Sequence, residues 1–475
     1  MMEVHDYTFL FGIGLFFAFM DAYGIGANDV ANSFATSVGS GSITLAQALI
    51  IACFMEFGGA YFLGANTTET IKGGIVDPKM YADVPELLML TMVCALIGSS
   101  TWVLFASSRG WPVSTTHAIV GAICGAGISA FGADGVQWSG IGKIVLSWVI
   151  SPVAAGFVCS IFFLFTKHVV LKHADSFRRG LIAIPAYFGF AIMVNVFYII
   201  FKGAPDSNLK TAAIGIPVGI AREKPAVHIE ETSQTKGEKL SADSIESGDA
   251  QANPSLVALE KKENWILKKL KSTIFAGLYH DIESKEDENV NAVHEYATKF
   301  DDDTERLFSA VQVITACFTS FAHGSNDVAN AIGPLATIYY IWSHANIDVA
   351  KAPVPTWILI YGGIAIDIGL MTYGYHVMKT LGNKVTYMSP TRGFSAEMGT
   401  SITILTCSKL SLPVSSTHCI TGATTAIGLL SGGGFKSLNW RLLLGVFAGW
   451  IATLPAAGVV SGVIFAFVSR SPQLV

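Results

Sequence analysis

Six carboxylic acids stand inside long apolar stretches of this chain with few basic residues beside them: Asp21, Asp29, Glu56, Asp327, Asp367 and Glu397. An ionisable group at the centre of a membrane helix costs roughly 2.5 to 3.5 kcal/mol. Acids in such stretches must therefore face a cavity, a cation or one another, unless they lie near a helix end and reach the interface. We expect several of them to share one polar cavity.

Two of these acids belong to a motif that occurs twice. Each copy carries oxygen-bearing side chains at positions i, i+1 and i+4: Asn28, Asp29 and Asn32, then Asn326, Asp327 and Asn330. Neighbouring glycines predict a local opening of the helix that frees backbone carbonyls: Gly24, Gly26 and Gly324. Carboxylate, amide and carbonyl oxygens suit a hard cation such as sodium. The alternative is that the asparagines only hydrogen-bond between helices.

A second motif, PVSTTH at 112–117 and PVSSTH at 413–418, is typical of a helix N-terminus. Its prolines, Pro112 and Pro413, suit the first helical turn. Hydroxyl residues that suit capping follow them: Ser114, Thr115, Thr116, Ser415, Ser416 and Thr417. Free N–H groups, the helix dipole and O–H donors can bind an anion without arginine. We expect the two termini to surround a tetrahedral oxyanion, although either copy alone also reads as an ordinary cap.

The histidines that end this second motif, His117 and His418, are expected to orient a neighbour or bond a carbonyl rather than to touch a substrate. A Ser–His hydrolase is the alternative. An enzyme needs one nucleophile, whereas here both halves carry the same motif, and neither has a lone GxSxG elbow. The sequence therefore favours a protein that is not an enzyme.

The spacing of the two motifs indicates a duplication. The first recurs from residue 26 to 324, an offset of 298, and the second from 112 to 413, an offset of 301. Two motifs that return in the same order at nearly the same distance indicate two related halves. Duplicated membrane halves are typical of transporters, which bind substrate near the midplane where the halves meet.

Composition places most of the chain in a membrane. Of the 475 residues, 51% are hydrophobic and 14% charged, and the mean hydropathy is +0.51. Residues 202–306 hold 14 of the 30 Lys and Arg and 20 of the 35 Asp and Glu, so the net charge of −5 comes mainly from there. The seven cysteines lack metal-ligand spacing. No nucleic-acid footprint is visible, and membrane lipid is the expected surrounding.

Apolar runs predict an all-α polytopic membrane protein with about 12 transmembrane helices, some re-entrant or discontinuous. The runs lie near 7–27, 45–64, 87–107, 116–131, 141–166, 181–201, 307–322, 331–343, 355–378, 396–409, 413–431 and 441–468. Residues 1–201 and 307–475 form the two repeats, and 202–306 a charged, mostly disordered central loop. Within it, 260–281 reads equally as a basic amphipathic helix on the membrane surface or as a short helix on a flexible loop.

Longer stretches around these motifs resemble the inorganic phosphate transporter (PiT) family: GANDVANSFATSVGSGSITLAQA at 26–48, GWPVSTTHAIVGAICG at 110–125, HGSNDVANAIGPLA at 323–336 and LPVSSTHCITGA at 412–423. The resemblance implies twelve spans, two inverted repeats, a cytoplasmic central loop and uptake of monovalent phosphate, driven usually by sodium and in some members by protons. It also implies that Glu56 and Glu397 match acidic positions used in transport. Asp367 is interpreted as the counterpart of Glu56.

We therefore expect cation-coupled, sodium-driven symport of inorganic phosphate across the plasma membrane. Proton coupling or another tetrahedral oxyanion such as sulfate is the alternative. The expected phosphate ligands are Ser114, Thr115, Thr116, Ser415, Ser416, Thr417, Asn28 and Asn326. The expected cation ligands are Asp29, Asn32, Asp327, Asn330, Glu56 and Glu397. No resident cofactor is expected beyond transported sodium ions, and a homodimer is left open.

Overall fold

The computed structural model describes residues 3–203, 288–349, 352–381, 384–410 and 412–471, and the regular secondary structure of these residues is helical apart from one isolated bridge. Nine helices in this part of the chain are long and apolar enough to cross a membrane. The α-helices are α1 (Thr8–Gly39), α2 (Leu45–Gly73), α3 (Pro85–Ser108), α4 (Thr115–Phe131), α5 (Trp138–Thr166), α6 (Ser176–Gly203), α9 (Glu288–Glu295), α10 (Asp302–His344), α11 (Thr356–Tyr373), α12 (Tyr375–Leu381), α13 (Pro390–Lys409), α14 (Ser416–Leu430) and α15 (Trp440–Arg470).

Helix α10 corrects two expectations. The separate runs 307–322 and 331–343 are one helix, and it begins before the predicted loop boundary at 306. The Asp301 side chain caps its start by accepting a hydrogen bond from the Thr304 amide at 2.9 Å. Residues 204–287 of the predicted loop, including the stretch 260–281, lie outside the described residues. The described part of the loop contains the helix α9.

Both helices that carry the Asn-Asp motif pass through it without a break, so the expected opening at the glycines is wrong. The glycines serve close packing instead. A Cβ on Gly26 would collide with the Ile366 carbonyl of α11, and a Cβ on Gly324 with the Glu56 carbonyl of α2. Each motif helix is therefore pressed against a helix of the other half.

Two helical hairpins, α3–α4 and α13–α14, carry the PVSTTH and PVSSTH motifs at the turns between their helices. Between α3 and α4 the chain turns at Gly110, whose φ of +67° favours glycine. The Ser114 and Ser415 side chains cap α4 and α14, accepting from the amides of His117 at 3.2 Å and His418 at 3.3 Å. The prolines of the motif lie two residues before these caps, outside the first turn where they were expected.

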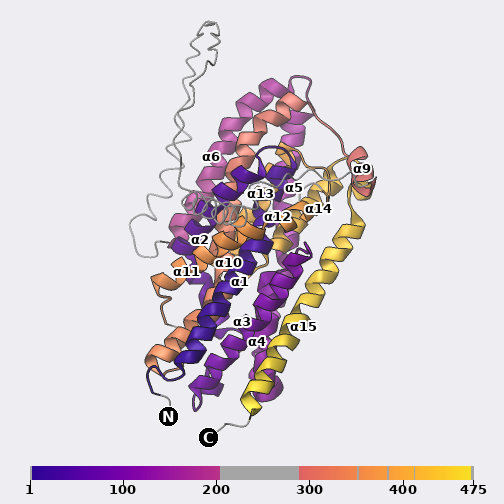
Figure 1. Ribbon diagram of the computed structural model, residues 1–475. Coiled ribbons are helices and arrows are strands. Elements are labelled where there is room, and N and C mark those ends of the chain that lie inside the picture. The colour runs from indigo at the N-terminus through magenta and orange to yellow at the C-terminus, as the bar shows by residue number, and fades with distance from the viewer. Residues whose placement is uncertain (1–2, 204–287, 350–351, 382–383, 411, 472–475) are drawn as a thin grey trace, which may run out of the picture.

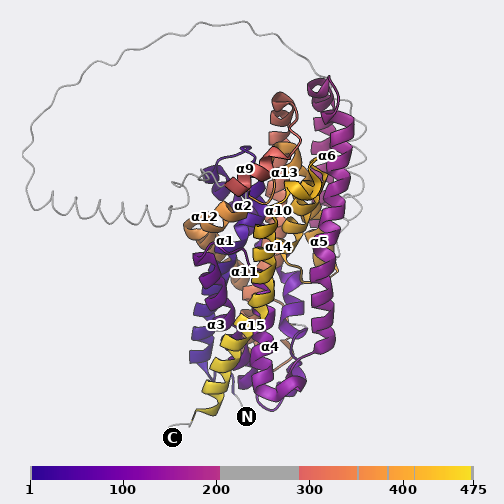
Figure 2. The same ribbon diagram turned by 90° about the vertical axis from the view of Figure 1, so that its right-hand side faces the viewer.

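In space, the two hairpins lie toward opposite ends of the molecule (Figures 1 and 2). The α3–α4 hairpin lies toward the end where both termini are found, and α13 and α14 lie toward the other end. Their tips meet: the Thr116 hydroxyl donates to the Val414 carbonyl at 3.4 Å, and the Thr417 hydroxyl donates to the Val113 carbonyl at 3.2 Å. The fold therefore brings two helix N-termini together in the interior.

Candidate functional site

The two aspartates of the repeated motif lie against the two hairpin tips. Asp29 accepts hydrogen bonds from the hydroxyls of Thr115 at 2.7 Å and Thr417 at 3.0 Å. Asp327 accepts from the Ser416 hydroxyl at 2.7 Å. Both aspartates are 1% exposed. One carboxylate thus contacts both tips, and we name the surrounding residues the central cluster: Asp29, Asn32, Thr115, Thr116, Asn326, Asp327, Asn330, Ser416 and Thr417.

The asparagines that end each motif reach the tip of the opposite half. The Asn32 amide donates to Thr417 at 3.0 Å and to Ser416 at 3.2 Å. The Asn330 amide donates to Thr116 at 3.2 Å and, at 3.3 Å, to Thr115. These reciprocal hydrogen bonds connect the first repeat with the second. The buried Asn32 Oδ1 accepts no hydrogen bond, which leaves a ligand oxygen free in the central cluster.

Four of the expected phosphate ligands hold the tips in place. Asn28 accepts from the Val113 amide at 3.1 Å, and Asn326 donates to the Val414 carbonyl at 2.8 Å. The side chains of Ser114 and Ser415 are occupied as caps, as described above. These four residues position the helix ends, whereas Thr115, Thr116, Ser416 and Thr417 carry the hydroxyls of the central cluster.

His323 joins two of the buried acids and was missed as a site residue. Its Nδ1 lies 2.6 Å from Glu56 Oε2, and its Nε2 lies 2.8 Å from Asp327 Oδ2. Glu56 also accepts from the Ser320 hydroxyl at 2.7 Å. One potential metal-binding group occurs among the described residues, namely Asp29, His323 and Asp327, whose ligand atoms lie within 4.8 Å of one another.

The two half-sites are not identical. With the offset of 298, the counterpart of His323 is Ile25. The helix contacts pair Gly324 with Glu56 and Gly26 with Ile366, so the counterpart of Glu56 is Ile366 and not Asp367. The prediction that Asp367 is the counterpart of Glu56 is therefore wrong by one residue. The polar Glu56–His323 pair between α2 and α10 is replaced by Ile366 and Ile25 between α11 and α1, and this difference is the sequence signal that could have pointed to His323.

Glu397 lies apart from the central cluster. Its carboxylate accepts from four side chains on α1 and α10: Thr36 at 2.7 Å, Ser37 at 2.7 Å, Thr315 at 2.6 Å and Gln312 at 3.2 Å. Thr36 and Ser37 stand two helical turns beyond Asp29 on α1. Neutral donors thus stabilise this fully buried acid, on the side of the central cluster away from the chain termini (Figure 1).

The histidines of the hairpin motif pack against tryptophans, His418 with its ring stacked and His117 with its ring tilted. His117 lies 3.7 Å from the Trp148 ring, and His418 lies 3.6 Å from the Trp450 ring, measured between centroids. His117 Nδ1 also lies 3.4 Å from the Trp450 carbonyl. The expectation that His117 contacts a carbonyl is confirmed. Both histidines lie in the first turn of their helices, α4 and α14.

Two basic side chains are buried as well, which the sequence reading did not anticipate. Lys72 donates to the Ala352 carbonyl. Arg392 is unexposed, donates to the Ser431 hydroxyl at 3.0 Å and to the Thr298 carbonyl at 2.6 Å, and lies over the Tyr387 ring. Neither residue contacts the central cluster in the hydrogen bonds of the described chain, so the groups there that could hold an anion are helix ends and hydroxyls.

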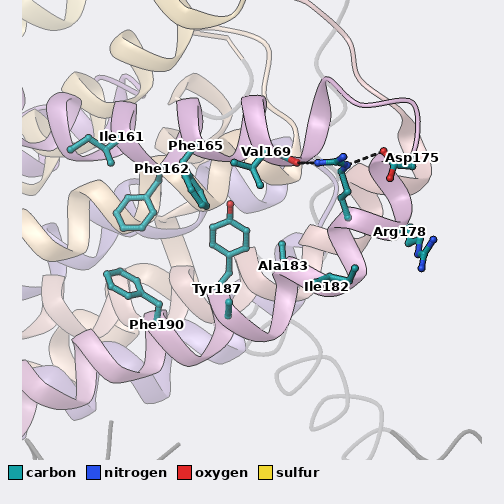
Figure 3. A pocket seen from close by; sticks show the side chains of 12 residues that line it. Ile161, Phe162, Phe165, Val169, Asp175, Arg178, Ile182, Ala183, Tyr187 and Phe190 are labelled. Atoms are coloured by element: carbon teal, nitrogen blue, oxygen red, sulfur yellow. Dashed lines mark hydrogen bonds and ion pairs between the residues drawn. The ribbon is translucent and has the colours of Figure 1, made fainter. Parts of the chain in front are cut away.

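A separate pocket between α5 and α6 has a different character (Figure 3). Its walls are mainly apolar and include Phe162, Tyr187 and Phe190. Charge is confined to one end, where Arg179 pairs with Asp175 at 2.8 Å. The converging polar groups that suit a small oxyanion are therefore found in the central cluster and not in this groove.

Comparison with known proteins decides the family. The model of the phosphate transporter family matches residues 25–461. This chain belongs to the phosphate transporter family. The phosphate-repressible phosphate permease pho-4 of Neurospora crassa is 34% identical, over 99% of each chain, and the sodium-dependent phosphate transporter 1 of Mus musculus is 28% identical, over 97% of this chain and 95% of that one.

A solved structure of this family supports the fold. A chain described as the sodium-dependent phosphate transporter superposes with a TM-score of 0.75 and 31% identity, over 98% of this chain and all of that one. These relatives are transporters and permeases, which are not enzymes. The chain is accordingly a membrane protein of the phosphate transporter family, as the resemblance predicted.

Proposed function

We propose that this protein carries inorganic phosphate into the cell together with sodium ions, across the plasma membrane. The observation that carries the proposal is the convergence of two helix N-termini, four hydroxyl side chains and two carboxylates in one buried cluster. Helix ends and hydroxyls suit an oxyanion, and carboxylate and amide oxygens suit sodium. The sodium-dependent relatives support this choice of cation.

The hydrogen bonds suggest how cation and phosphate are coupled. Thr115, Thr417 and Ser416 now donate to the aspartates. A sodium ion on Asp29 and Asp327 competes for the same carboxylate oxygens and releases those hydroxyls. The freed O–H groups, together with the first amides of α4 and α14, then donate to phosphate. Sodium therefore binds first, and phosphate without sodium meets a cluster whose donors are occupied.

The architecture proposed for transport is a pair of inverted repeats with twelve spans. Reciprocal packing supports it: Gly121 of α4 packs on the Leu454 carbonyl of α15, while Gly422 of α14 packs on the Pro152 carbonyl of α5. Offsets of 301 and 302 relate these pairs. Hairpins in opposite halves of the molecule fit an inverted relation, in which each hairpin covers the cluster from one side (Figure 2).

Uptake of radiolabelled phosphate into proteoliposomes tests the proposal. An inward sodium gradient is expected to drive accumulation above equilibrium, and excess sulfate is expected to leave the rate unchanged. Equal uptake with sodium and with choline, under a pH gradient that drives accumulation, would replace sodium by protons. Inhibition by sulfate would widen the substrate class, and the absence of any uptake would contradict the proposal.

A further inference from the structure

Asp21 on α1 is a buried acid that the central cluster does not use. It is 1% exposed, and neither of its carboxylate oxygens has a hydrogen-bond partner. It takes part in none of the ion pairs among the described residues. Because an ionised carboxylate without a partner is expensive in a membrane interior, Asp21 is stable there either as the protonated acid or as a carboxylate paired with a cation.

Further oxygen atoms without partners lie beside it. The Ser99 side chain of α3 neighbours Asp21, is unexposed, and makes no hydrogen bond of good geometry. Ser461 of α15 packs against Gly98, the residue before Ser99, and its buried hydroxyl also lacks a partner. A buried carboxylate without a hydrogen-bond partner, with one such hydroxyl beside it and a second on the neighbouring helix, is unusual, because buried polar groups are normally paired, and it fits a ligand site.

The position of Asp21 connects it to the central cluster. It stands eight residues before Asp29 on the same helix, about 12 Å along the axis, towards the end where both termini lie (Figure 1). Asn28, seven residues on, shares its face of α1 and donates to Ser107 of α3 at 3.0 Å. The seam between α1 and α3 therefore has polar side chains at both ends, with Gly24 packed against Val103 between them.

The other half of the protein differs at this place. With the offset of 298, the counterpart of Asp21 is Thr319, whose hydroxyl donates to the backbone carbonyl of Glu397 at 3.1 Å. Glu397 thus provides a buried acid on the side away from the termini, and Asp21 provides one on the side near them. Four side-chain donors bond the Glu397 carboxylate, whereas the one donor placed beside Asp21 is the Ser99 hydroxyl.

We propose that Asp21 and Ser99 bind a sodium ion on the terminal side of the central cluster, as a separate site from which the ion passes along α1. Carboxylate and hydroxyl oxygens are suitable ligands, and water molecules complete the shell. The inference rests on the proposed function for the identity of the cation. Its binding, however, is measurable without transport.

Equilibrium binding of radioactive sodium to the purified full chain in detergent, without phosphate, tests the site. Asp21→Asn removes the charge and keeps the shape of the side chain. Asp134→Asn is the matched control, because Asp134 is an exposed acid between α4 and α5. We expect Asp21→Asn to bind one sodium ion fewer per chain than the wild type, and Asp134→Asn to bind the same number.

An unchanged sodium count and affinity in Asp21→Asn would overturn the proposal. If that variant fails to fold, Ser99→Ala decides: an approximately tenfold weaker sodium affinity at one site supports the proposal, and wild-type affinity at every site contradicts it. Failure of the proposed function is measured separately, as absence of phosphate uptake by the wild type in liposomes. In that case the number of sodium ions bound per chain still tests the role of Asp21.

Discussion

At the scale of single residues, the central cluster pairs each buried carboxylate with neutral donors. Asp29 has hydroxyl and amide partners, including Asn32 at 2.9 Å, whereas Asp327 also lies beside His323. The two aspartates are thus related by duplication but differ in charge environment. His323 lies close to both carboxylates, since its ligand atoms and those of Asp29 and Asp327 are within 4.8 Å of one another, and it pairs with Asp327.

Replacement of Asp29 by Asn is expected to abolish phosphate uptake while leaving the amount of folded protein intact. The substitution keeps the shape but removes the charge that attracts the cation, and it relieves burial of an acid. Uptake and size-exclusion profiles measure the two effects. Asp348→Asn, an exposed loop acid, is the control. Wild-type uptake by Asp29→Asn would remove this residue from the site.

Thr417→Val is expected to raise the KM for phosphate by roughly fivefold, equivalent to about 1 kcal/mol for one lost hydrogen bond. Valine has the same shape but no hydroxyl to donate to the anion. Ser431→Ala is a suitable comparison, because this hydroxyl accepts from Arg392 and lies outside the central cluster. An unchanged KM in Thr417→Val with saturating sodium would contradict a direct contact with phosphate.

At the scale of elements, helix ends and glycine contacts position the site. The caps were predictable because Ser114 and Ser415 act on amides only three residues away. The contacts of Asn32 with Thr417 span 385 residues and were not predictable, since a local motif does not name its distant partner. Hydropathy likewise divided α10 at its Asn-Asp motif, although tertiary hydrogen bonds satisfy those polar side chains and the helix continues.

Gly26→Ala is expected to destabilise the protein by about 1 to 3 kcal/mol, because the added methyl group forces α1 away from α11. Gly12→Ala lies in the same helix with nothing within 4 Å of its added Cβ, and it is the matched control. Thermal unfolding in detergent compares the two. Equal transition temperatures for both variants would show that close packing at Gly26 contributes nothing.

At the scale of the whole molecule, duplication explains the symmetric parts of the site and not the asymmetric ones. The paired motifs predicted two helix ends around one anion, and the structure places those ends together. His323 and Asp21 lie where the halves differ, so the repeated motifs did not identify His323 and assigned no role to Asp21, although Asp21 stands as an acid inside an apolar stretch. Such differences give a carrier with two similar halves a distinct chemistry on each side.

The order of binding is the central claim, and calorimetric titration of the purified protein with phosphate tests it most directly. Hydroxyls that donate to Asp29 and Asp327 must be released by sodium before they can hold phosphate. The account predicts heat of phosphate binding in sodium chloride and none in choline chloride. Phosphate binding of equal affinity in both salts would contradict it.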